Sequence, residues 1–360
     1  MMMKTKNIIF LPFIALLLVS CEKQIDFEPE DVSPYVVMVS KPEGDSLMSV
    51  YLGRSRFFLD NRDFGSINDA TVTLTAGGVS SVGIFTPQCF MLLNDNFYYE
   101  KKSKDYYDDY YYYDTIYYDG YTFTLRPRPG DTVRLSAIIP GVVEPVTATT
   151  VIPNRPHVEI LDFAADTLDE AGYSNLYYRV RIRVYNEGLN FFGVSLSRGE
   201  ARRTDIDSAM RWDSSIVRQV SFEVNDALVN NQSLESALDG DDGSFSGYNM
   251  YFSSELFSGG YHDFTLEFSG YWKQDGVDQL DIPLYVNVTQ FSEDLYRYNL
   301  TTRKSDSDLD ELFAEPVQVY CNINGGIGIL GGSTKLSLRA PRAIAENFYN
   351  SNSYFKKAKK

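Results

Sequence analysis

The chain has 360 residues, with 33 Lys and Arg against 49 Asp and Glu, and a formal net charge of −16. Such an acidic protein is a poor partner for nucleic acid, because phosphate binding needs a basic patch. The length allows two domains, each with its own core. With 27 Tyr and 23 Phe, residues that favour strands, the composition indicates an all-β protein.

The N-terminus has the pattern of a bacterial lipoprotein signal peptide. Lys4 and Lys6 precede an apolar run over 8–19, which at about a dozen residues is too short to span a bilayer. The run ends in Leu-Val-Ser-Cys, which places a small residue before the thiol of Cys21. We therefore expect residues 1–20 to be a signal peptide and Cys21 to carry a lipid. The alternative is a plain secretory signal with an incidental cysteine.

Residues 21–33 are acidic and contain proline, which predicts an extended tether between the lipid and the folded protein. Acidic residues directly behind a lipidated cysteine resemble the surface-export signal of Bacteroidota lipoproteins. At ~0.8 kcal/mol per buried methylene, two or three acyl chains hold a protein on the membrane almost permanently. We expect an outer-membrane, lipid-anchored protein that is exposed at the cell surface. The alternative is a tether that is merely a solvated linker.

Residues 34–153 contain short alternating runs of apolar and polar residues, separated by turn residues. This pattern predicts an N-terminal β-sandwich of the immunoglobulin or transthyretin type. Its end is marked by Ile-Pro-Asn-Arg-Pro at 152–156, because proline withholds a ladder donor and restricts the residue before it. The expected strands are 34–40, 47–53, 70–76, 82–86, 121–125, 132–139 and 146–152.

Residues 154–345 predict a larger antiparallel β domain with one short helix, followed by a basic tail at 346–360. In the clearest strand, 176–185, apolar residues alternate with Arg179, Arg181 and Arg183, which predicts a core face and an arginine stripe. The helix is expected after Ser292, which offers an N-cap before two acidic residues. The other expected strands are 191–196, 216–224, 261–268, 282–290, 317–322 and 335–339, with a loop over 238–248.

A Tyr-rich insertion spans 97–121 and holds eleven tyrosines interleaved with Lys and Asp. The four successive tyrosines at 110–113 must present rings to both faces of any strand, and the flanking charges oppose burial of both faces. Because tyrosine is enriched at recognition surfaces, we predict a partner-binding element, the alternative being a long hairpin with exposed rings. The candidate residues here are Tyr106, Tyr107, Tyr110, Tyr111, Tyr112, Tyr113, Tyr117 and Tyr118.

The arginine stripe formed by Arg179, Arg181 and Arg183 is the second candidate partner-binding surface. Its side chains either pair with carboxylates of neighbouring strands or meet an acidic partner. Cys89 and Cys321 lie far apart in the sequence. We expect two separate buried thiols there, the alternative being a single disulfide.

The sequence offers little for catalysis, and we expect no enzyme, catalytic residue, cofactor or metal. His157 and His262 each stand alone, and the motifs of metalloproteases, serine hydrolases and phosphate-binding loops are missing. A carboxylate pair for glycoside cleavage stays open, although nothing selects one. The acidic clusters at 239–243 and 306–311 lack the EF-hand pattern, which favours solvated loops. The glycines between 325 and 332 lack a following Lys-Ser/Thr, which favours turns and close backbone packing.

Several passages together resemble one protein family. They are the Ala-Thr-Val-Thr-Leu strand at 70–74, Pro-Gly-Asp-Thr-Val at 129–133, Val-Thr-Ala-Thr-Thr-Val-Ile-Pro at 146–153, Tyr-Arg-Tyr at 296–298, Phe-Ala-Glu-Pro-Val at 313–317, and Asn-Ile-Asn-Gly-Gly-Ile-Gly-Ile-Leu-Gly-Gly at 322–332. They resemble a Bacteroidota outer-membrane lipoprotein family that carries a domain of unknown function and is encoded beside TonB-dependent transporters. The resemblance implies a two-part β architecture and a role beside an outer-membrane barrel.

The expected function is therefore that of a non-enzymatic accessory or binding subunit of a TonB-dependent outer-membrane transporter complex. One alternative is a structural subunit of an outer-membrane protein assembly or export complex. The other is a surface protein that binds or hydrolyses glycans or peptides.

Overall fold

A computed structural model describes residues 34–55, 65–98, 113–170, 173–203, 210–232, 245–270, 283–307 and 318–346. The predicted all-β class is confirmed, since these residues form strands with only two α-helices among them, α2 (Ala227–Gln232) and α4 (Glu293–Ser307). One helix was expected, so the short helix α2 was missed. None of the helices in these ranges has the length and apolar character to cross a bilayer.

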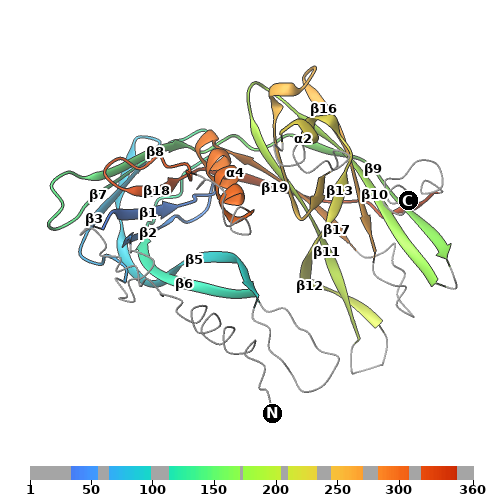
Figure 1. Ribbon diagram of the computed structural model, residues 1–360, viewed down its shortest axis with the longest axis horizontal. Helices are drawn as coiled ribbons and strands as arrows, with labels where there is room; N and C mark the ends of the chain where they lie inside the picture. The colour runs from blue at the N-terminus through green and yellow to red at the C-terminus, as the bar shows by residue number, and fades with distance from the viewer. Residues whose placement is uncertain are drawn as a thin grey trace, which may run out of the picture. The chain divides into compact units, whose positions relative to one another are not determined.

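The first sandwich consists of two sheets, with strand orders β18-β1-β2-β6-β5 and β4-β3-β7-β8 (Figure 1). Alternate residues of both sheets, such as Leu52 and Leu74, are fully buried between them, as the period of two along each strand requires. The strands are β1 (Val36–Ser40), β2 (Ser49–Arg54), β3 (Thr71–Ala76), β4 (Val79–Val82), β5 (Ile84–Tyr98), β6 (Tyr113–Thr122), β7 (Thr132–Ile138), β8 (Val146–Val151) and β18 (Ile327–Leu330).

Two strands of the first sandwich differ from the sequence-based expectation. The strand expected at 82–86 straddles the end of β4 and the start of β5. The strand expected at 121–125 is mostly wrong, because β6 ends at Thr122. Tyr121 and Phe123 are buried and Leu125 packs against the same core, so the apolar alternation continues after the ladder has stopped.

The glycines at 325–332 give a turn and close backbone packing, as predicted. Gly325 has a positive φ of 79° at the turn before β18. β18 then pairs in parallel with β1, and a Cβ on Gly328 would lie only 2.1 Å from the carbonyl oxygen of Met38. Through this segment, Ile323 and Leu330 belong to the first hydrophobic core, although they lie far along the chain.

The second sandwich also has two sheets, with orders β14-β13-β16-β10-β9-β20 and β12-β11-β17-β19, where β15 pairs with β11. Both sheets contribute to one core that includes Val180, Phe264, Val194 and Val286. The strands are β9 (Val158–Glu170), β10 (Tyr173–Tyr185), β11 (Phe191–Arg203), β12 (Met210–Val220), β13 (Phe222–Val224), β14 (Phe245–Gly247), β15 (Asn249–Ser253), β16 (Tyr261–Ser269), β17 (Leu284–Phe291), β19 (Ser333–Arg339) and β20 (Ile344–Ala345).

Here too some expectations fail for physical reasons. β9 is absent from the prediction, because Phe163, Ala164 and Ala165 are all buried and a register shift interrupts its pairing with β10, so the run shows no clean alternation. β14 lies inside the expected loop at 238–248, whose first part is outside the described residues. The strand expected at 317–322 does not form over 318–322, where the Tyr320 amide donates to Thr301 Oγ1 of α4 instead of to a ladder.

The helix predicted after Ser292 is confirmed as α4. Hydrogen bonds join its first turn and its N-cap to the segment 320–332. Ser292 Oγ accepts hydrogen bonds from the amides of Leu295, at 3.2 Å, and Gly332, at 3.1 Å. Asp294 in the first turn accepts from Thr150 Oγ1 at 3.0 Å and from the hydroxyl of Tyr320 at 2.8 Å. Burial and this bond to Asp294 raise the pKa of Tyr320 to about 12.

We expect Gly328→Ala to lower the free energy of unfolding by about 3 kcal/mol or more, because the new Cβ would strike the Met38 carbonyl and the φ of +121° disfavours any side chain. Urea unfolding of the purified protein measures the loss. Gly259→Ala is the matched control, since nothing lies within 4 Å of its Cβ position. Equal, small losses in both variants would contradict the proposed close packing.

Candidate functional site

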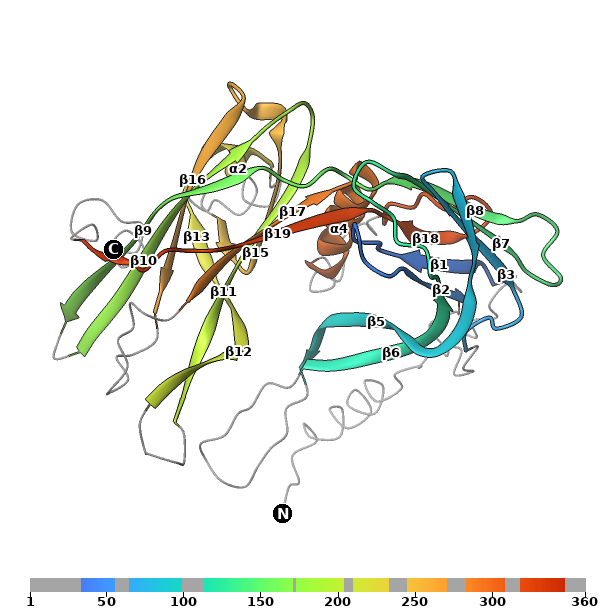
Figure 2. The same ribbon diagram turned by 180° about the vertical axis from the view of Figure 1, so that it is seen from behind.

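The Tyr-rich stretch belongs to a two-stranded ribbon formed by β5 and β6. The two strands pair from Ile84 opposite Thr122 to Tyr98 opposite Tyr113. β2 accompanies β6 only at Thr122 and Tyr121, so beyond these residues the ribbon has no third strand among the described ones. Figures 1 and 2, which view the protein from opposite sides, both show the β5–β6 ribbon extending away from the first sandwich. Residues 99–112, which connect the two strands in the sequence, lie outside the described residues.

The tyrosines at the base of the ribbon have different surroundings. Tyr121 is buried and its hydroxyl accepts a hydrogen bond from the Ala70 amide at 3.0 Å, so the prediction that the stretch avoids the core is wrong for this residue. Tyr118 packs edge-on against Tyr51 with ring centroids 5.2 Å apart. Tyr117 is 56% exposed.

The remaining tyrosine candidates are not placed. Tyr113 is described only by its backbone pairing with Tyr98. Of the candidates, Tyr117 is the one that the structure places with its ring exposed at the surface of the ribbon, and a partner-binding role for the stretch stays a prediction. Outside the described residues lie Tyr106, Tyr107, Tyr110, Tyr111 and Tyr112.

The three arginines of β10 all point to the outer face of their sheet and form ion pairs with carboxylates from other segments. Arg179 Nη2 lies 2.9 Å from Glu346 Oε2, and Arg181 Nη1 lies 2.9 Å from Asp162 Oδ2. Pairing with neighbouring carboxylates, one of the two alternatives that the sequence left open, is thus what the described residues show. A further role of the stripe in meeting an acidic partner stays a prediction.

Arg183 makes the most complete contact of the stripe. Its Nε and Nη2 donate to the two carboxylate oxygens of Asp263 on β16, at 2.6 and 2.8 Å, and its guanidinium lies 4.0 Å from the ring centroid of Tyr261. The hydrogen bond from Arg183 lowers the pKa of Asp263, and the same bond raises the pKa of Arg183. This bidentate pair holds the Arg183 side chain in place at the end of the stripe near Tyr185.

One feature of this face was missed in the sequence. Glu223 on β13 lies opposite Glu267 on β16, which in turn lies opposite Arg179 on β10. Burial raises the pKa of Glu267, and the charge of Arg179 partly offsets this. The two glutamates are separated by 44 residues of sequence, so no local signal could have predicted their pairing.

Neither histidine stands alone, contrary to the sequence-based expectation. His262 Nε2 lies 2.9 Å from Asp226 Oδ2, and the His157 ring stacks on Tyr185 with centroids 4.1 Å apart. Among the residues that the structure describes, no three His, Cys, Asp or Glu side chains gather as metal ligands do. The acidic cluster 239–243 lies outside the described residues, and 306–311 is described only as far as Ser307, the last residue of α4.

The two cysteines are separate, as expected, but they are not both buried. Neither Cys89 nor Cys321 forms a disulfide, Cys89 is half-buried and Cys321 is exposed. Cys321 does not lie in a strand, although one was expected over 317–322. Its sulfur accepts a hydrogen bond from the Ile323 amide at 3.4 Å. Cys21, the predicted lipidation site, lies outside the described residues.

We expect Arg183→Gln to raise the pKa of Asp263 toward its ordinary value of 3.8. Because the folded-state pKa lies below this value, the pair stabilises the protein above about pH 4, and this contribution is lost as the pH falls through the folded-state pKa. Carboxyl ¹³C shifts measured against pH test the change. Arg179→Gln is the control, since Arg179 pairs with Glu346. The same pKa of Asp263 in the wild type and Arg183→Gln would contradict the assignment.

The sequence also matches a known protein family. A family model described as Domain of unknown function (DUF4249) matches residues 22–339, which is most of the chain and includes the first sandwich, the ribbon, the arginine stripe and every strand of the second sandwich except β20. None of the curated proteins compared with the chain matches it. The chain therefore belongs to the DUF4249 family.

Proposed function

We propose that the protein is a non-enzymatic lipoprotein of the outer membrane that serves as an accessory or binding subunit of a TonB-dependent transporter complex. In this proposal Cys21 carries the lipid, residues 21–33 form the tether, and the folded part lies at the cell surface. The ribbon of β5 and β6 contacts the transporter barrel or its cargo. The arginine stripe is available as a second contact.

The proposal rests mainly on the lack of a third strand beside the outer part of the ribbon among the described residues. An isolated two-stranded hairpin is marginally stable in water, and beyond Tyr121 this one has no third strand among the described residues. It is also built largely of apolar and aromatic residues, including Met91, Leu92, Leu93 and Ile116. A partner that packs against the ribbon would supply the contacts that a third strand supplies elsewhere in the sheet.

The tyrosines suit this role chemically. A tyrosine side chain combines a large apolar ring with a hydroxyl and loses little entropy on binding, because only two torsions are fixed. The lysines and aspartates that alternate with the tyrosines at 101–114 would form the polar rim of such an interface.

Membrane attachment and the kind of partner have separate support. The family match begins at residue 22, directly behind Cys21, so the family domain starts where the expected mature chain starts. The choice of a TonB-dependent barrel as partner comes from the resemblance described above. The strongly acidic composition supports a protein partner over a nucleic acid.

We expect Cys21→Ala to leave an unprocessed or mislocalised precursor, because no thiol remains to accept the diacylglyceryl group. Membrane fractionation and the mass of the recovered protein measure this. Cys321→Ala is the matched control, since the thiol of Cys321 is also exposed but follows no signal peptide. Recovery of normally processed, membrane-bound Cys21→Ala protein would overturn the proposed anchor.

Replacement of residues 101–112 by a Gly-Ser linker should abolish copurification of the outer-membrane barrel while the melting temperature changes by only a few degrees. Tyr117 and Tyr118 are kept, because Tyr118 packs against Tyr51. The matched control replaces 233–244, a segment of equal length, and should copurify the barrel as the wild type does. If the 101–112 variant still copurifies the barrel, the ribbon is not the interface.

A further inference from the structure

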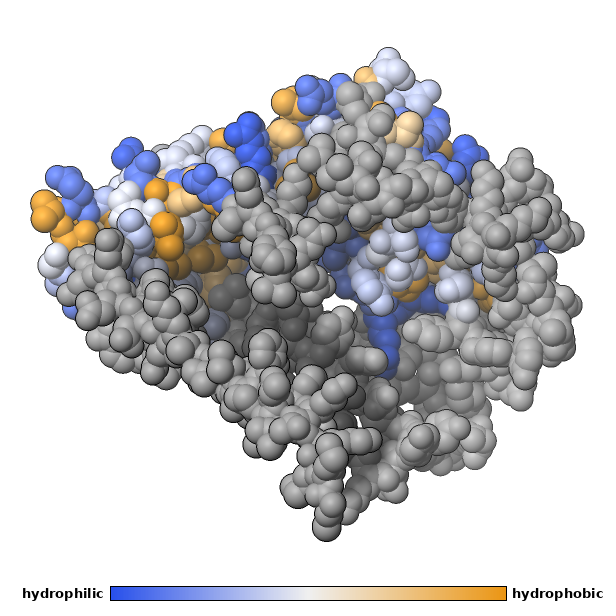
Figure 3. Space-filling model, viewed as in Figure 1, coloured by the Kyte–Doolittle hydropathy of each residue, from blue (hydrophilic) through white to orange (hydrophobic). Residues whose placement is uncertain are grey.

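β4 is a free sheet edge of unusual composition. It pairs only with β3 among the described strands, and its residues Val79 and Val82 are 56% and 61% exposed. Val-Ser-Ser-Val contains no charge and no proline, although natural proteins usually protect such edges with one or the other. On the face drawn in Figure 3, hydrophobic residues lie among hydrophilic ones, as is usual for a protein surface.

The turn before β4 fixes which backbone groups point outward. Gly77 and Gly78 have φ of 56° and 80°, as a type I′ hairpin turn requires, and Ala76 lies opposite Val79. The residues that flank a two-residue hairpin turn bond each other, and bonding alternates along an antiparallel ladder. The N–H and C=O groups of Ser80 and Val82 therefore face the free edge, where an added strand would bond.

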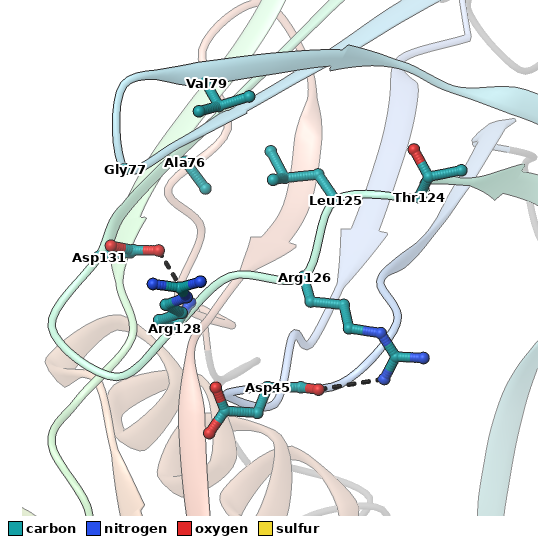
Figure 4. Close-up of a pocket in the computed structure, with 9 residues that line it drawn as sticks. All are labelled: Asp45, Ala76, Gly77, Val79, Thr124, Leu125, Arg126, Arg128 and Asp131. Carbon is teal, nitrogen blue, oxygen red and sulfur yellow. Dashed lines mark hydrogen bonds between the residues drawn. The ribbon is translucent and has the colours of Figure 1, made fainter.

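A cavity of about 590 Å³ lies at the Val79 end of this edge (Figure 4). Val79 and Ala76 line one side, and Leu125, Arg126 and Arg128 come from the segment between β6 and β7. Gly77 of the β3–β4 turn and Asp131 of the loop before β7 also line the cavity and lie close to each other. A Cβ on Gly77 would lie 3.1 Å from Asp131 Oδ1.

Among the described residues, the two arginines of this cavity form no ion pair with its acidic residues Asp45 and Asp131. Asp45 pairs with Arg155 at 2.8 Å, and Asp131 Oδ2 accepts from the backbone amide of Arg128 at 2.8 Å. Among the residues that the structure describes, the guanidinium of Arg126 donates only to the carbonyl oxygen of Asp45, at 3.1 Å. Within the described part of the chain, the guanidinium of Arg128 has no hydrogen-bonding or ion-pair partner, which contrasts with the paired arginines of β10.

We infer that β4 and this cavity bind the C-terminal segment of a partner protein as an added antiparallel strand, with its terminal carboxylate held by Arg126 and Arg128. A strand antiparallel to β4 runs from Val82 toward Val79, so its C-terminus arrives at the cavity. Because Val79, Arg126 and Arg128 line the same cavity, a partner strand that ends beside Val79 would bring its terminal carboxylate to the two guanidinium groups. Backbone bonds to Ser80 and Val82 supply binding, and the guanidinium groups, whose geometry matches a carboxylate, supply selectivity for a chain end.

This inference goes beyond the proposed function, because the ribbon plays no part in it. The test uses fluorescein-labelled Lys-Val-Thr-Val-Ser-Val with either a free C-terminal carboxylate or a C-terminal amide, titrated with the detergent-solubilised mature protein. Fluorescence anisotropy should show binding of the acid peptide and about tenfold weaker binding of the amide. The protein in which 101–112 is replaced should bind both peptides as the wild type does, which separates this site from the ribbon.

Two sets of variants test the two parts of the site. The double variant Arg126→Gln, Arg128→Gln should bind acid and amide peptides equally weakly. Ser80→Pro removes an outward N–H and should weaken binding of both peptides, whereas Ser80→Ala keeps that N–H and should bind as the wild type does. Circular dichroism checks that each variant is folded. Failure of the wild type to bind the acid peptide, equal binding of acid and amide by the wild type, or unchanged binding by Ser80→Pro would each overturn the inference.

Discussion

The first sandwich depends on a direct approach of two backbones that only glycine allows. A Cβ on Gly326 would lie 2.6 Å from the Val36 carbonyl oxygen, and one on Gly332 would lie 2.4 Å from the Val151 carbonyl oxygen. Because these positions have no side chain, a segment from the end of the chain pairs with the first strand. Gly332 and Ser292 exchange hydrogen bonds, so the same segment also holds the start of α4.

The ribbon is anchored on this arrangement. Ile329 of β18 packs with Val39 of β1 and Phe90 of β5 in a small cluster that Tyr51 and Tyr118 complete. The base of the ribbon thus rests on strands from both ends of the described chain, whereas its outer part pairs only with itself among the described strands. A rigid base with an end that lacks further sheet partners is a suitable way to present a binding segment at a fixed distance from the sandwich.

The acidic charge of the protein is distributed unevenly around its arginines. On the outer face of β10, carboxylates such as Asp162 and Asp263 satisfy the arginine stripe, so this face is held together by its own pairs. At the cavity beside β4, Arg126 and Arg128 lack such partners among the described residues. Both sets of arginines alternate with other residues along the chain, so the sequence alone did not distinguish them. The carboxylates that other segments bring to β10 do so.

Local patterns predicted much of the fold and little of the sites. Alternation predicted β3, β7 and the buried face of β10, and the N-cap at Ser292 predicted α4, because these signals lie within a few residues. β9 was missed where burial of successive residues removed the alternation. The Glu223 and Glu267 pair and the unpaired arginines of the cavity depend on contacts between distant segments.

The proposed function depends most on contact between the ribbon and an outer-membrane barrel. Photocrosslinking in intact cells, with a benzophenone amino acid at Tyr117, tests this most directly, because Tyr117 is exposed on the described part of the ribbon. Val143, which is 94% exposed in the loop between β7 and β8, provides the control position. We predict a crosslink to one β-barrel protein from position 117 and none from position 143. No barrel crosslink from position 117, or the same products from both positions, would contradict it.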